Sequence, residues 1–492
     1  MKKYLALLAI PAALLFSCGT AADPGSPDTP DVPVQKTIKA DERADKGGSG
    51  VMLQGFTWTS PTEDGDWYKT MSANAPDIKD TFEYVWFPPC TDSADANGYL
   101  PRQLNKLEQA YTKNGTHSPT DDYERFYGTE VELKKVIDDI KPCKAIADIV
   151  INHRCGLTEW GDFQNPDWGC VKGKRYPAIC KDDEGFTSPD AEFMNGCRYR
   201  GADDTGENYS AGRDIDHTSA EVQDGIIEWL NNVMKKAGFV GWRYDMTKGY
   251  AGIYNGYYNA MTKPEFSVGE YWDGNAATLK KWLDATTGIN RNVAGVPGRT
   301  FDFACHYTLV GVFGNENDRG EKGESLENKN FGLLGAGKNL FEQYPGYAVS
   351  FVDNHDTGST QKDSPVDQTD MGAVYAYILT HPGYPCVAWF HYFAAEDCPS
   401  ETSKAQYLGG TTVKGTTFTL KSHIQKLIKL RKDAGITDLS KREVLSATDT
   451  CYAAKITGEN KDLIVSIGET WEAPTGYSVY TEGTDFTVYV QD

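Results

Sequence analysis

Short apolar runs alternate with longer amphipathic segments from about residue 50 to residue 435. Several of these runs are almost continuously hydrophobic, which is typical of parallel strands buried on both faces. We expect eight strands, at Val51–Thr57, Tyr84–Phe87, Ala145–Asn152, Val240–Tyr244, Phe266–Glu270, Thr300–Phe303, Ala348–Val352 and Cys386–Phe390. Eight strands that alternate with helices predict an α/β fold, the (β/α)8 TIM barrel.

The clearest helical pattern spans Ser219–Ala237, where apolar residues recur at helical spacing. Thr218 and Glu221 form a capping-box pattern at its start, and Gly238 follows its end as a helix stop. Further helices are expected at Glu130–Ile140, Leu279–Asp284, Met371–Leu379 and Leu420–Lys432.

Two segments interrupt the alternation. Residues 154–214 lie between the third and fourth strands and are too long for an ordinary loop, so we predict an inserted domain on the C-terminal face of the barrel. The barrel itself would comprise residues 48–153 and 215–434. Residues 435–492 are expected to form a small antiparallel β domain, with strands at Cys451–Ile456, Asp462–Ile467, Tyr477–Tyr480 and Asp485–Val490.

The N-terminus has the features of an export signal. Lys2 and Lys3 precede a short apolar run that ends Leu15-Phe16-Ser17-Cys18, which resembles a bacterial lipobox. We predict a lipoprotein signal peptide at residues 1–18, a membrane anchor on Cys18 and a flexible, Pro-rich linker at residues 19–47. The protein would then be exported and held at the bacterial cell surface or in the periplasm. An ordinary cleaved signal, which would give a secreted protein, is the alternative.

Net charge narrows the choice of partners. The 492-residue chain has a formal net charge of −21, which argues against binding nucleic acid, because phosphates require a basic face. The same charge argues against binding to anionic lipid through a polybasic segment and suits a neutral substrate. Hydrophobic residues make up 39% of the chain, which is enough for a sizeable core. We expect the protein to be a monomer.

Cysteines are numerous, with 11 in the chain. Four of them cluster in the expected insert, at Cys155, Cys170, Cys180 and Cys197. In an exported chain one or two disulfides could stabilise this segment. Buried thiols, as we expect at Cys143 and Cys386, and a zinc cluster are the alternatives, although the chain has no tight CxxC pair.

Four of the expected strands end in polar clusters, at Asp148–His153, Gly241–Gly249, Val268–Asp273 and Phe351–Asp356. A single carboxylate at a strand end is commonly a helix cap or half of an ion pair. Four clusters on barrel strands would meet at the C-terminal face, where such barrels carry their active sites. Three carboxylates with an arginine suit glycoside hydrolysis, in which one carboxylate attacks the sugar and a second protonates the leaving oxygen.

In this order the clusters resemble the motifs of the α-amylase family, glycoside hydrolase family 13. The third strand of plant and bacterial members is similar to Ala147–Arg154, and the resemblance runs from about residue 50 to the C-terminus. It implies a retaining enzyme that hydrolyses internal α-1,4-glucosidic bonds in starch and related α-glucans. Asp245 would be the nucleophile, Glu270 the general acid/base, and Asp356 the third carboxylate, which stabilises the distorted sugar.

The resemblance also assigns substrate-binding positions. Arg243 would orient and ionise the nucleophile, and the other matching residues are Tyr99, His153, Lys248, Trp272 and His355. Simpler interpretations remain for some of them: core packing for Tyr99 and Trp272, and a solvated side chain for Lys248.

A calcium ion between the insert and the barrel is a further implication of the resemblance. Calcium takes six to eight oxygen ligands. The matching positions are the side chains of Asn152, Asp204 and Asp214 and the backbone oxygens of Ala211 and Gly249. Asp216 is a rival for Asp214, and both Asp204 and Asp214 could instead be ordinary loop acids.

Two other functions are weighed against an endo-acting hydrolase. A family member that transfers glucosyl units or releases small maltosaccharides would have nearly the same motifs, and its products would distinguish it. A catalytically silent glycan-binding protein would lack a catalytic carboxylate, whereas all three are present.

Overall fold

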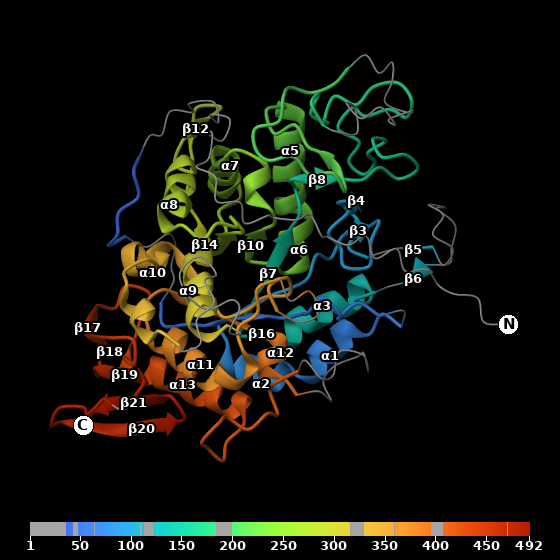
Figure 1. Cartoon of the computed structure of the whole chain (residues 1–492). Coiled ribbons are helices and arrows are strands. Elements are labelled where there is room, and N and C mark those ends of the chain that lie inside the picture. The colour runs from blue at the N-terminus through green and yellow to red at the C-terminus, as the bar shows by residue number, and fades with distance from the viewer. Residues whose placement is uncertain are drawn as a thin grey trace.

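The computed structural model describes residues 36–42, 48–62, 64–108, 111–112, 123–124, 126–183, 199–314, 329–358, 361, 363–394, 407–469 and 471–492 (Figure 1). The predicted signal peptide, Cys18, Cys197 and most of the predicted linker lie outside these residues. Within the described part of the chain, no helix is long and apolar enough to cross a membrane.

Eight parallel strands form a closed barrel, in the order β1-β16-β15-β14-β11-β10-β7-β2. Their bounds are β1 Met52–Gln54, β2 Tyr84–Trp86, β7 Lys144–Ile149, β10 Gly241–Tyr244, β11 Phe266–Gly269, β14 Arg299–Phe301, β15 Ala348–Phe351 and β16 Tyr384–Ala388. Each coincides with one of the eight predicted strands, so the predicted (β/α)8 barrel is confirmed. Almost all of their side chains are buried, as expected for strands with a packed interior on one face and helices on the other.

Helices surround the barrel (Figure 1). They are α1 Trp67–Ala73, α2 Ala75–Thr81, α3 Glu130–Asp139, α5 Ala220–Trp229, α6 Lys235–Ala237, α7 Gly252–Thr262, α8 Ala276–Ala285, α9 Phe303–Phe313, α10 Leu340–Gln343, α11 Met371–Thr380, α12 Trp389–Tyr392 and α13 Leu420–Ala434. The predicted helices correspond to α3, the α5–α6 segment, α8, α11 and α13. Helices α7 and α9 are buried over most of their circumference, and a helix without a polar face shows no amphipathic period.

The predicted capping box at the start of α5 is wrong. The N-cap is Ser219, whose hydroxyl accepts a hydrogen bond from the Val222 backbone N–H. Thr218 instead donates to the Asp216 carboxylate at 2.6 Å. The predicted stop is confirmed, because Gly238 has φ 113°, a left-handed conformation that glycine adopts without a steric penalty. A π-helical turn at 230–234 joins α5 to α6.

The inserted segment leaves and re-enters the barrel at one place, because β8 His153–Arg154 pairs antiparallel with β9 Arg213–Asp214. Buried Arg154 donates to the carbonyl oxygens of Arg102 and Pro166 at 2.9 and 2.8 Å. The cation therefore stabilises loop backbone that forms little regular structure.

The described cysteines are unpaired thiols, so no disulfide forms among them. Burial raises the pKa of Cys155 to about 12 and that of Cys170 to about 11, so both stay protonated and unreactive at neutral pH. Cys143 and Cys386 are buried thiols, as predicted.

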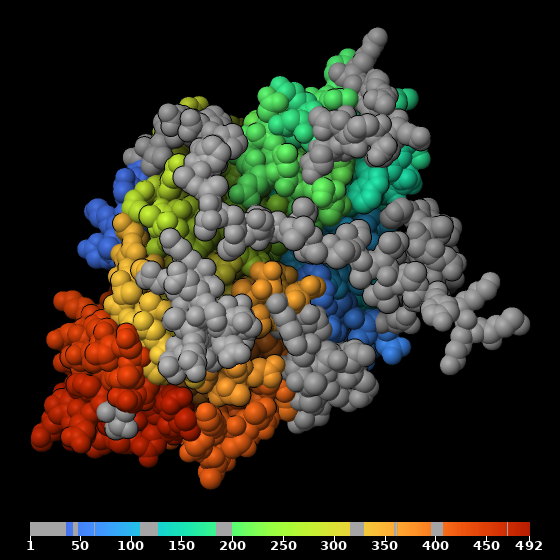
Figure 2. Space-filling model, viewed as in Figure 1, coloured from blue at the N-terminus to red at the C-terminus, as the bar shows by residue number. Residues whose placement is uncertain are grey.

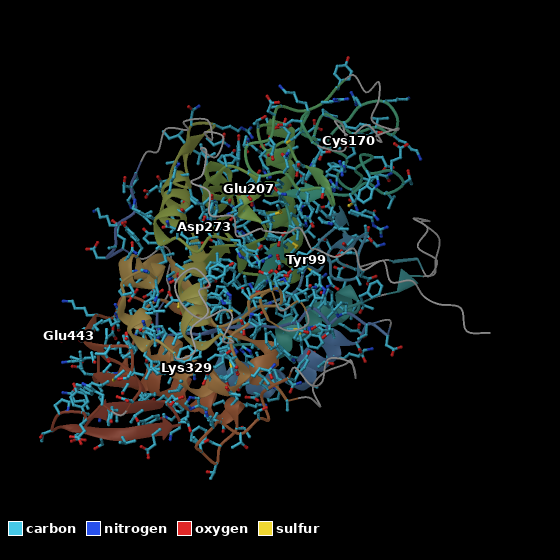
Figure 3. The ribbon with its side chains drawn as sticks, viewed as in Figure 1. Tyr99, Cys170, Glu207, Asp273, Lys329 and Glu443 are labelled. Atoms are coloured by element: carbon cyan, nitrogen blue, oxygen red, sulfur yellow. The ribbon has the colours of Figure 1, made fainter. Side chains whose placement is uncertain are left out.

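A five-stranded antiparallel sheet ends the chain, in the order β17-β18-β19-β21-β20. Its bounds are β17 Arg442–Ala447, β18 Cys451–Ile456, β19 Leu463–Gly468, β20 Tyr477–Gly483 and β21 Phe486–Gln491. Four strands match predicted ones, whereas β17 is mostly exposed and has no apolar alternation to reveal it. Lys329, labelled in Figure 3, pairs with Asp370 beside α11 and with Asp485 at the sheet, which ties the sheet to the barrel.

The C-terminal sheet and the insert lie at opposite corners of the molecule in Figures 1 and 2. Short strand pairs complete the structure: β3 Asp92–Ser93 with β4 Pro101–Gln103, β5 Tyr111–Thr112 with β6 Tyr123–Glu124, and β12 Ile289–Asn290 with β13 Val293–Ala294.

Candidate active site

Arg243 is the centre of the cluster at the C-terminal ends of the strands. It is fully buried on β10, and its Nη1 lies 2.6 Å from Oδ1 of Asp245, two residues further on. Its Nη2 lies 2.6 Å from Oε1 of Glu270, which follows the neighbouring strand β11. One guanidinium therefore holds both predicted catalytic carboxylates, each only 7% exposed.

The second oxygen of Glu270 is held by the backbone. The Met246 N–H donates to Oε2 of Glu270 at 3.1 Å. Met246 has φ 43°, a left-handed conformation that is uncommon for a residue with a side chain. Strain of this kind persists where the surrounding structure demands it, and here the turn directs an N–H toward Glu270.

Two of the three predicted catalytic carboxyl groups, Glu270 and Asp356, have raised pKa values. Burial, opposed by Arg243 and reinforced by the nearby Asp245 charge, raises the pKa of Glu270 to about 8. Burial and Asp245 likewise raise the pKa of Asp356 to about 7, again against Arg243. At neutral pH Glu270 therefore carries a proton that it can donate.

Asp148 is a further carboxylate in the cluster that the sequence did not single out as a site residue. It lies opposite Arg243 in the β7–β10 register, and its Oδ1 is 2.9 Å from Arg243 Nη1. Its Oδ2 accepts hydrogen bonds from Trp86 Nε1 at 2.9 Å and Tyr99 Oη at 3.0 Å. Burial raises the pKa of Asp148 to about 6. The sequence did carry a signal for Asp148, because it is a charged residue within an otherwise apolar strand.

A chain of hydrogen bonds connects His355 to this carboxylate. Gln54 Nε2 lies 2.8 Å from His355 Nδ1, so Nδ1 accepts and Nε2 carries the proton. Nε2 lies 2.8 Å from Tyr99 Oη and 3.4 Å from Oδ2 of Asp356. Burial and the Arg243 charge hold the pKa of His355 well below its usual range, so the ring is neutral.

Aromatic rings form one wall of this cluster. The rings of Tyr99, Trp58 and His355 lie against one another, with centroids 6.0 Å apart for Trp58–Tyr99, 5.4 Å for Tyr99–His355 and 5.8 Å for Trp58–His355. On the insert side, the His153 ring stacks on Tyr209 at 4.0 Å, and its Nε2 lies 2.7 Å from the Tyr99 carbonyl oxygen. Sequence reasoning missed three contributors, Gln54, Trp58 and Tyr209, because none of them lies in the four strand-end clusters.

The structure thus brings together seven of the predicted residues: Tyr99, His153, Arg243, Asp245, Glu270, His355 and Asp356. Lys248 and Trp272 lie further out, at the rim. Lys248 Nζ is 3.6 Å from Glu207 and 3.9 Å from Asp273, and these two carboxylates are neighbours in Figure 3. Trp272 donates from Nε1 to Tyr307 Oη at 2.8 Å.

The predicted calcium ligands also converge. Oδ1 of Asn152 and Oδ2 of Asp204 are buried oxygens without a hydrogen-bond partner in the described structure. A Cβ on Gly249 would lie 1.9 Å from that Asn152 oxygen, and one on Gly206 would lie 2.4 Å from the Lys248 carbonyl oxygen. The loop of Asp204 and Gly206 therefore packs directly on the turn after β10.

Two further predicted ligand positions lie on the returning segment of the insert, where Asp214 is buried and Ala211 precedes it by three residues. Burial, with the nearby Asp182 charge, raises the pKa of Asp204 to about 7. Buried oxygens that lack donors suit a hard cation. No group of three or more His, Cys, Asp or Glu side chains in the described residues could by itself hold a metal ion, so amide and backbone oxygens would have to contribute.

Comparison with known proteins gives a consistent picture, although no family model matches the chain. The chain is 31% identical over 471 residues to probable α-amylase 2 of Arabidopsis thaliana, covering 91% of this chain and 95% of that protein. It is 31% identical to the chloroplastic α-amylase 3 of the same plant, covering 90% of this chain and 44% of the relative. A glucan 1,4-α-maltotetraohydrolase of Stutzerimonas stutzeri is 27% identical over 390 residues, 70% of this chain and 59% of that protein.

Solved structures share the fold. The α-amylase from Geobacillus thermoleovorans, complexed with acarbose, superposes with a TM-score of 0.60 at 13% identity, covering 90% of this chain and 98% of that one. The α-amylase from Malbranchea cinnamomea superposes with a TM-score of 0.59 at 17% identity, covering 92% of this chain and 98% of that one.

Proposed function

Because the chain belongs to the α-amylase family of glycoside hydrolases, we propose that its Arg243-centred carboxylates cut internal α-1,4-glucosidic bonds with retention of configuration. The observation that supports this most strongly is that one buried guanidinium, that of Arg243, lies 2.6 Å from a carboxyl oxygen of both Asp245 and Glu270. Retaining glycosidases need two carboxyl groups about 5–5.5 Å apart, and contacts to two nitrogens of one guanidinium keep these two carboxyl groups close together.

In the first step, Asp245 is the nucleophile. Its carboxylate attacks the anomeric carbon while Glu270 gives its proton to the leaving glycosidic oxygen. The bond between the anomeric carbon and that oxygen breaks, and an ester bond to Asp245 forms. The raised pKa of Glu270 keeps the required proton in place at neutral pH.

In the second step, Glu270 is the base. It takes a proton from a water molecule, whose oxygen attacks the anomeric carbon and displaces Asp245. Two inversions give net retention, so the new reducing end is an α-anomer. Glu270 is reprotonated and Asp245 is again a carboxylate, so both groups return to their starting states.

The surrounding residues form the pocket for the sugar at the cleavage site. We propose that Asp356 binds its hydroxyls and stabilises the positive charge that develops on the ring. Burial lowers the pKa of both His355 and His153, so both rings are neutral, and both residues are hydrogen-bonded to Tyr99. They would therefore shape the pocket without adding positive charge next to the developing oxocarbenium ion.

Endo-action is tested with amylose. Iodine staining and reducing ends are followed in the same reaction, since a cut within the chain destroys staining after few bonds are broken. Rapid loss of staining with mixed maltosaccharide products is expected. Slow loss of staining with release of one small sugar would instead indicate an enzyme that acts from chain ends. That result would favour the alternative function, a family member that releases small maltosaccharides.

The pH profile should have an alkaline limb set by Glu270. The reaction needs its protonated form, so kcat/KM on maltoheptaose is expected to fall as pH rises through the Glu270 pKa of about 8. An aryl maltotrioside whose chloronitrophenol leaves without protonation should show a much weaker alkaline limb. Equal alkaline limbs for the two substrates would contradict the role of Glu270 as the acid.

Members of the α-amylase family usually bind calcium, and we propose that this chain does so. The ion would be held by the side chains of Asn152, Asp204 and Asp214 and by the backbone oxygens of Ala211 and Gly249. Support comes from the buried oxygens of Asn152 and Asp204 that lack hydrogen-bond partners. When bound, Ca²⁺ would supply positive charge that neutralises these acids and joins the insert to the barrel.

Removal of calcium should therefore destabilise the fold. A ligand present at 100 times its Kd stabilises the native state by about 2.7 kcal/mol, so a chelator is expected to lower the Tm, and added Ca²⁺ to restore it. Asp204→Asn should reduce this calcium-dependent shift. The matched control is Asp203→Asn at the adjacent position. It removes an exposed carboxylate that pairs with Lys181. A Tm that thorough chelation leaves unchanged would refute the proposal.

A further inference from the structure

Tyr99 lies in a tight loop whose backbone is held by one carboxylate. The loop, residues 94–100, joins β3 to β4. Oδ1 of Asp95 accepts hydrogen bonds from the backbone N–H groups of Gly98 at 3.1 Å and Leu100 at 3.0 Å, the two residues that flank Tyr99. We infer that Asp95 is a positioning residue for the reaction, which fixes the backbone on both sides of Tyr99 and so keeps the tyrosine ring in the sugar pocket.

The carboxylate of Asp95 is itself held by Ser93. The Ser93 hydroxyl donates to Oδ1 of Asp95 at 2.5 Å, and its oxygen accepts from the N–H groups of Asp95 at 3.3 Å and Leu100 at 3.2 Å. Ser93 is 1% exposed, so water does not compete for these bonds. Every hydrogen bond of Asp95 in the described structure lies within residues 93–100, so Asp95 acts on the reaction through this loop.

The conformation of the loop requires such support. Gly98 has φ 88°, a left-handed conformation that glycine adopts without a steric penalty, and glycine leaves the backbone free to move where nothing restrains it. The Asn97 amide donates to the Trp58 carbonyl oxygen at 3.3 Å, and the Asn97 carbonyl oxygen accepts from Tyr127 Oη at 3.1 Å. Both of these bonds lie before Gly98, whereas the Asp95 carboxylate acts on both sides of Tyr99.

Three contacts of Tyr99 depend on where its backbone lies. Its Oη is 3.0 Å from Oδ2 of Asp148 and 2.8 Å from Nε2 of His355, and its carbonyl oxygen is 2.7 Å from Nε2 of His153. A shift of the loop would therefore disturb the tyrosine ring and both histidines of the pocket together. Misplacement of groups that orient a substrate costs rate even when the chemical groups are intact.

The strands on either side of the loop are fixed independently of Asp95. Arg102 on β4 pairs with Asp92 on β3 at 2.8 Å, and both side chains are buried. The Pro101 carbonyl oxygen accepts from the Cys155 N–H at 2.8 Å, next to β8 of the insert (Figure 1). Removal of the Asp95 carboxylate should therefore loosen the loop around Tyr99 and leave the strands in place.

This inference rests on the proposed function and is tested first by kinetics. Asp95→Ala should lower kcat/KM about 10- to 100-fold, mainly through kcat, as expected for a misplaced orienting group. The loss should be similar on maltoheptaose and on an aryl maltotrioside, because both place a sugar against Tyr99. Asp95→Asn keeps an oxygen that accepts from both N–H groups and should retain most of the activity. An equal loss in the two variants would contradict the inference.

A double-mutant cycle tests whether Asp95 acts through Tyr99. In a Tyr99→Ala background, Asp95→Ala should cause no further loss of kcat/KM, because residues that act through one another are not additive. Losses that multiply in the double variant would overturn the inference. Asp64→Ala, which removes an exposed carboxylate before α1, is the control and should match the wild type in either background.

The position of Tyr99 gives a test that does not depend on activity. In a crystal structure of Asp95→Ala, Tyr99 Oη should lie beyond hydrogen-bond distance of Asp148, whereas the wild type and Asp95→Asn should keep that bond. A tyrosine ring in the wild-type place would overturn the inference. Absence of starch hydrolysis by the wild type, together with a displaced ring in Asp95→Ala, would instead overturn the proposed function alone.

Discussion

Asp245→Asn is expected to abolish starch hydrolysis, lowering kcat by at least about 10⁴-fold. The amide has nearly the same shape but cannot form the glycosyl ester. The fold should survive, because Arg243 would retain its ion pair with Asp148 and its contact with Glu270, so the buried guanidinium is not left uncompensated. The measurement is kcat from the release of reducing ends, with the Tm taken on the same preparation.

Asp224→Asn makes the same chemical change on the surface, where Asp224 pairs with Arg291, and should leave kcat at the wild-type value. A second check uses Asp245→Gly with added azide, which can enter the space left by the carboxylate. Azide would attack the anomeric carbon from the side where the Asp245 carboxylate was, so the product should be a β-glycosyl azide. Turnover by Asp245→Asn within about tenfold of the wild type would show that another group is the nucleophile.

Glu270→Gln is expected to lower kcat on starch by about 10²–10⁴-fold, the usual contribution of a general acid. Glu270 is protonated at neutral pH because its pKa is raised to about 8, so a neutral amide keeps the charge of the cluster unchanged. The loss should be smaller for the first step on an aryl maltotrioside, whose leaving group needs no proton. Stopped-flow measurement should then show a burst of the aryl product followed by slow turnover.

Glu265→Gln is the matched control, because Glu265 is an exposed carboxylate on the chain just before β11 and pairs with Lys144. It should behave as the wild type. If Glu270→Gln lost equal activity on starch and on the aryl substrate with no burst, Glu270 would be needed for the structure of the site and not for proton donation.

The barrel could be predicted from sequence because its strands are buried on both faces and form almost continuous apolar runs. The same burial hides α9, whose residues are apolar on nearly every side and so show no helical period. Strand β17 was missed for the opposite reason, since it is an exposed edge strand that is recognisable only once β18 pairs with it.

Site residues that lie at strand ends could be predicted from the sequence. Contacts that depend on the register between neighbouring strands could not. Asp245 and Glu270 follow consecutive strands, so their meeting could be expected. The Asp148–Arg243 pair depends on which residues of β7 and β10 lie side by side, and the hydrogen bond from Gln54 to His355 joins strands far apart in sequence. The calcium positions came from resemblance alone, because ligands spread over several loops show no local pattern. The lipid anchor on Cys18, and the export that it implies, stay predictions from the N-terminal sequence.

The most direct test of the double displacement is the configuration of the first product. Proton NMR of maltoheptaose during the first minutes of hydrolysis resolves the α- and β-anomeric protons of new reducing ends before mutarotation mixes them. We predict that the α signal appears first and the β signal grows only later. If the β signal appeared first, water would be attacking the sugar directly, and the assignment of Asp245 as a covalent nucleophile would be wrong.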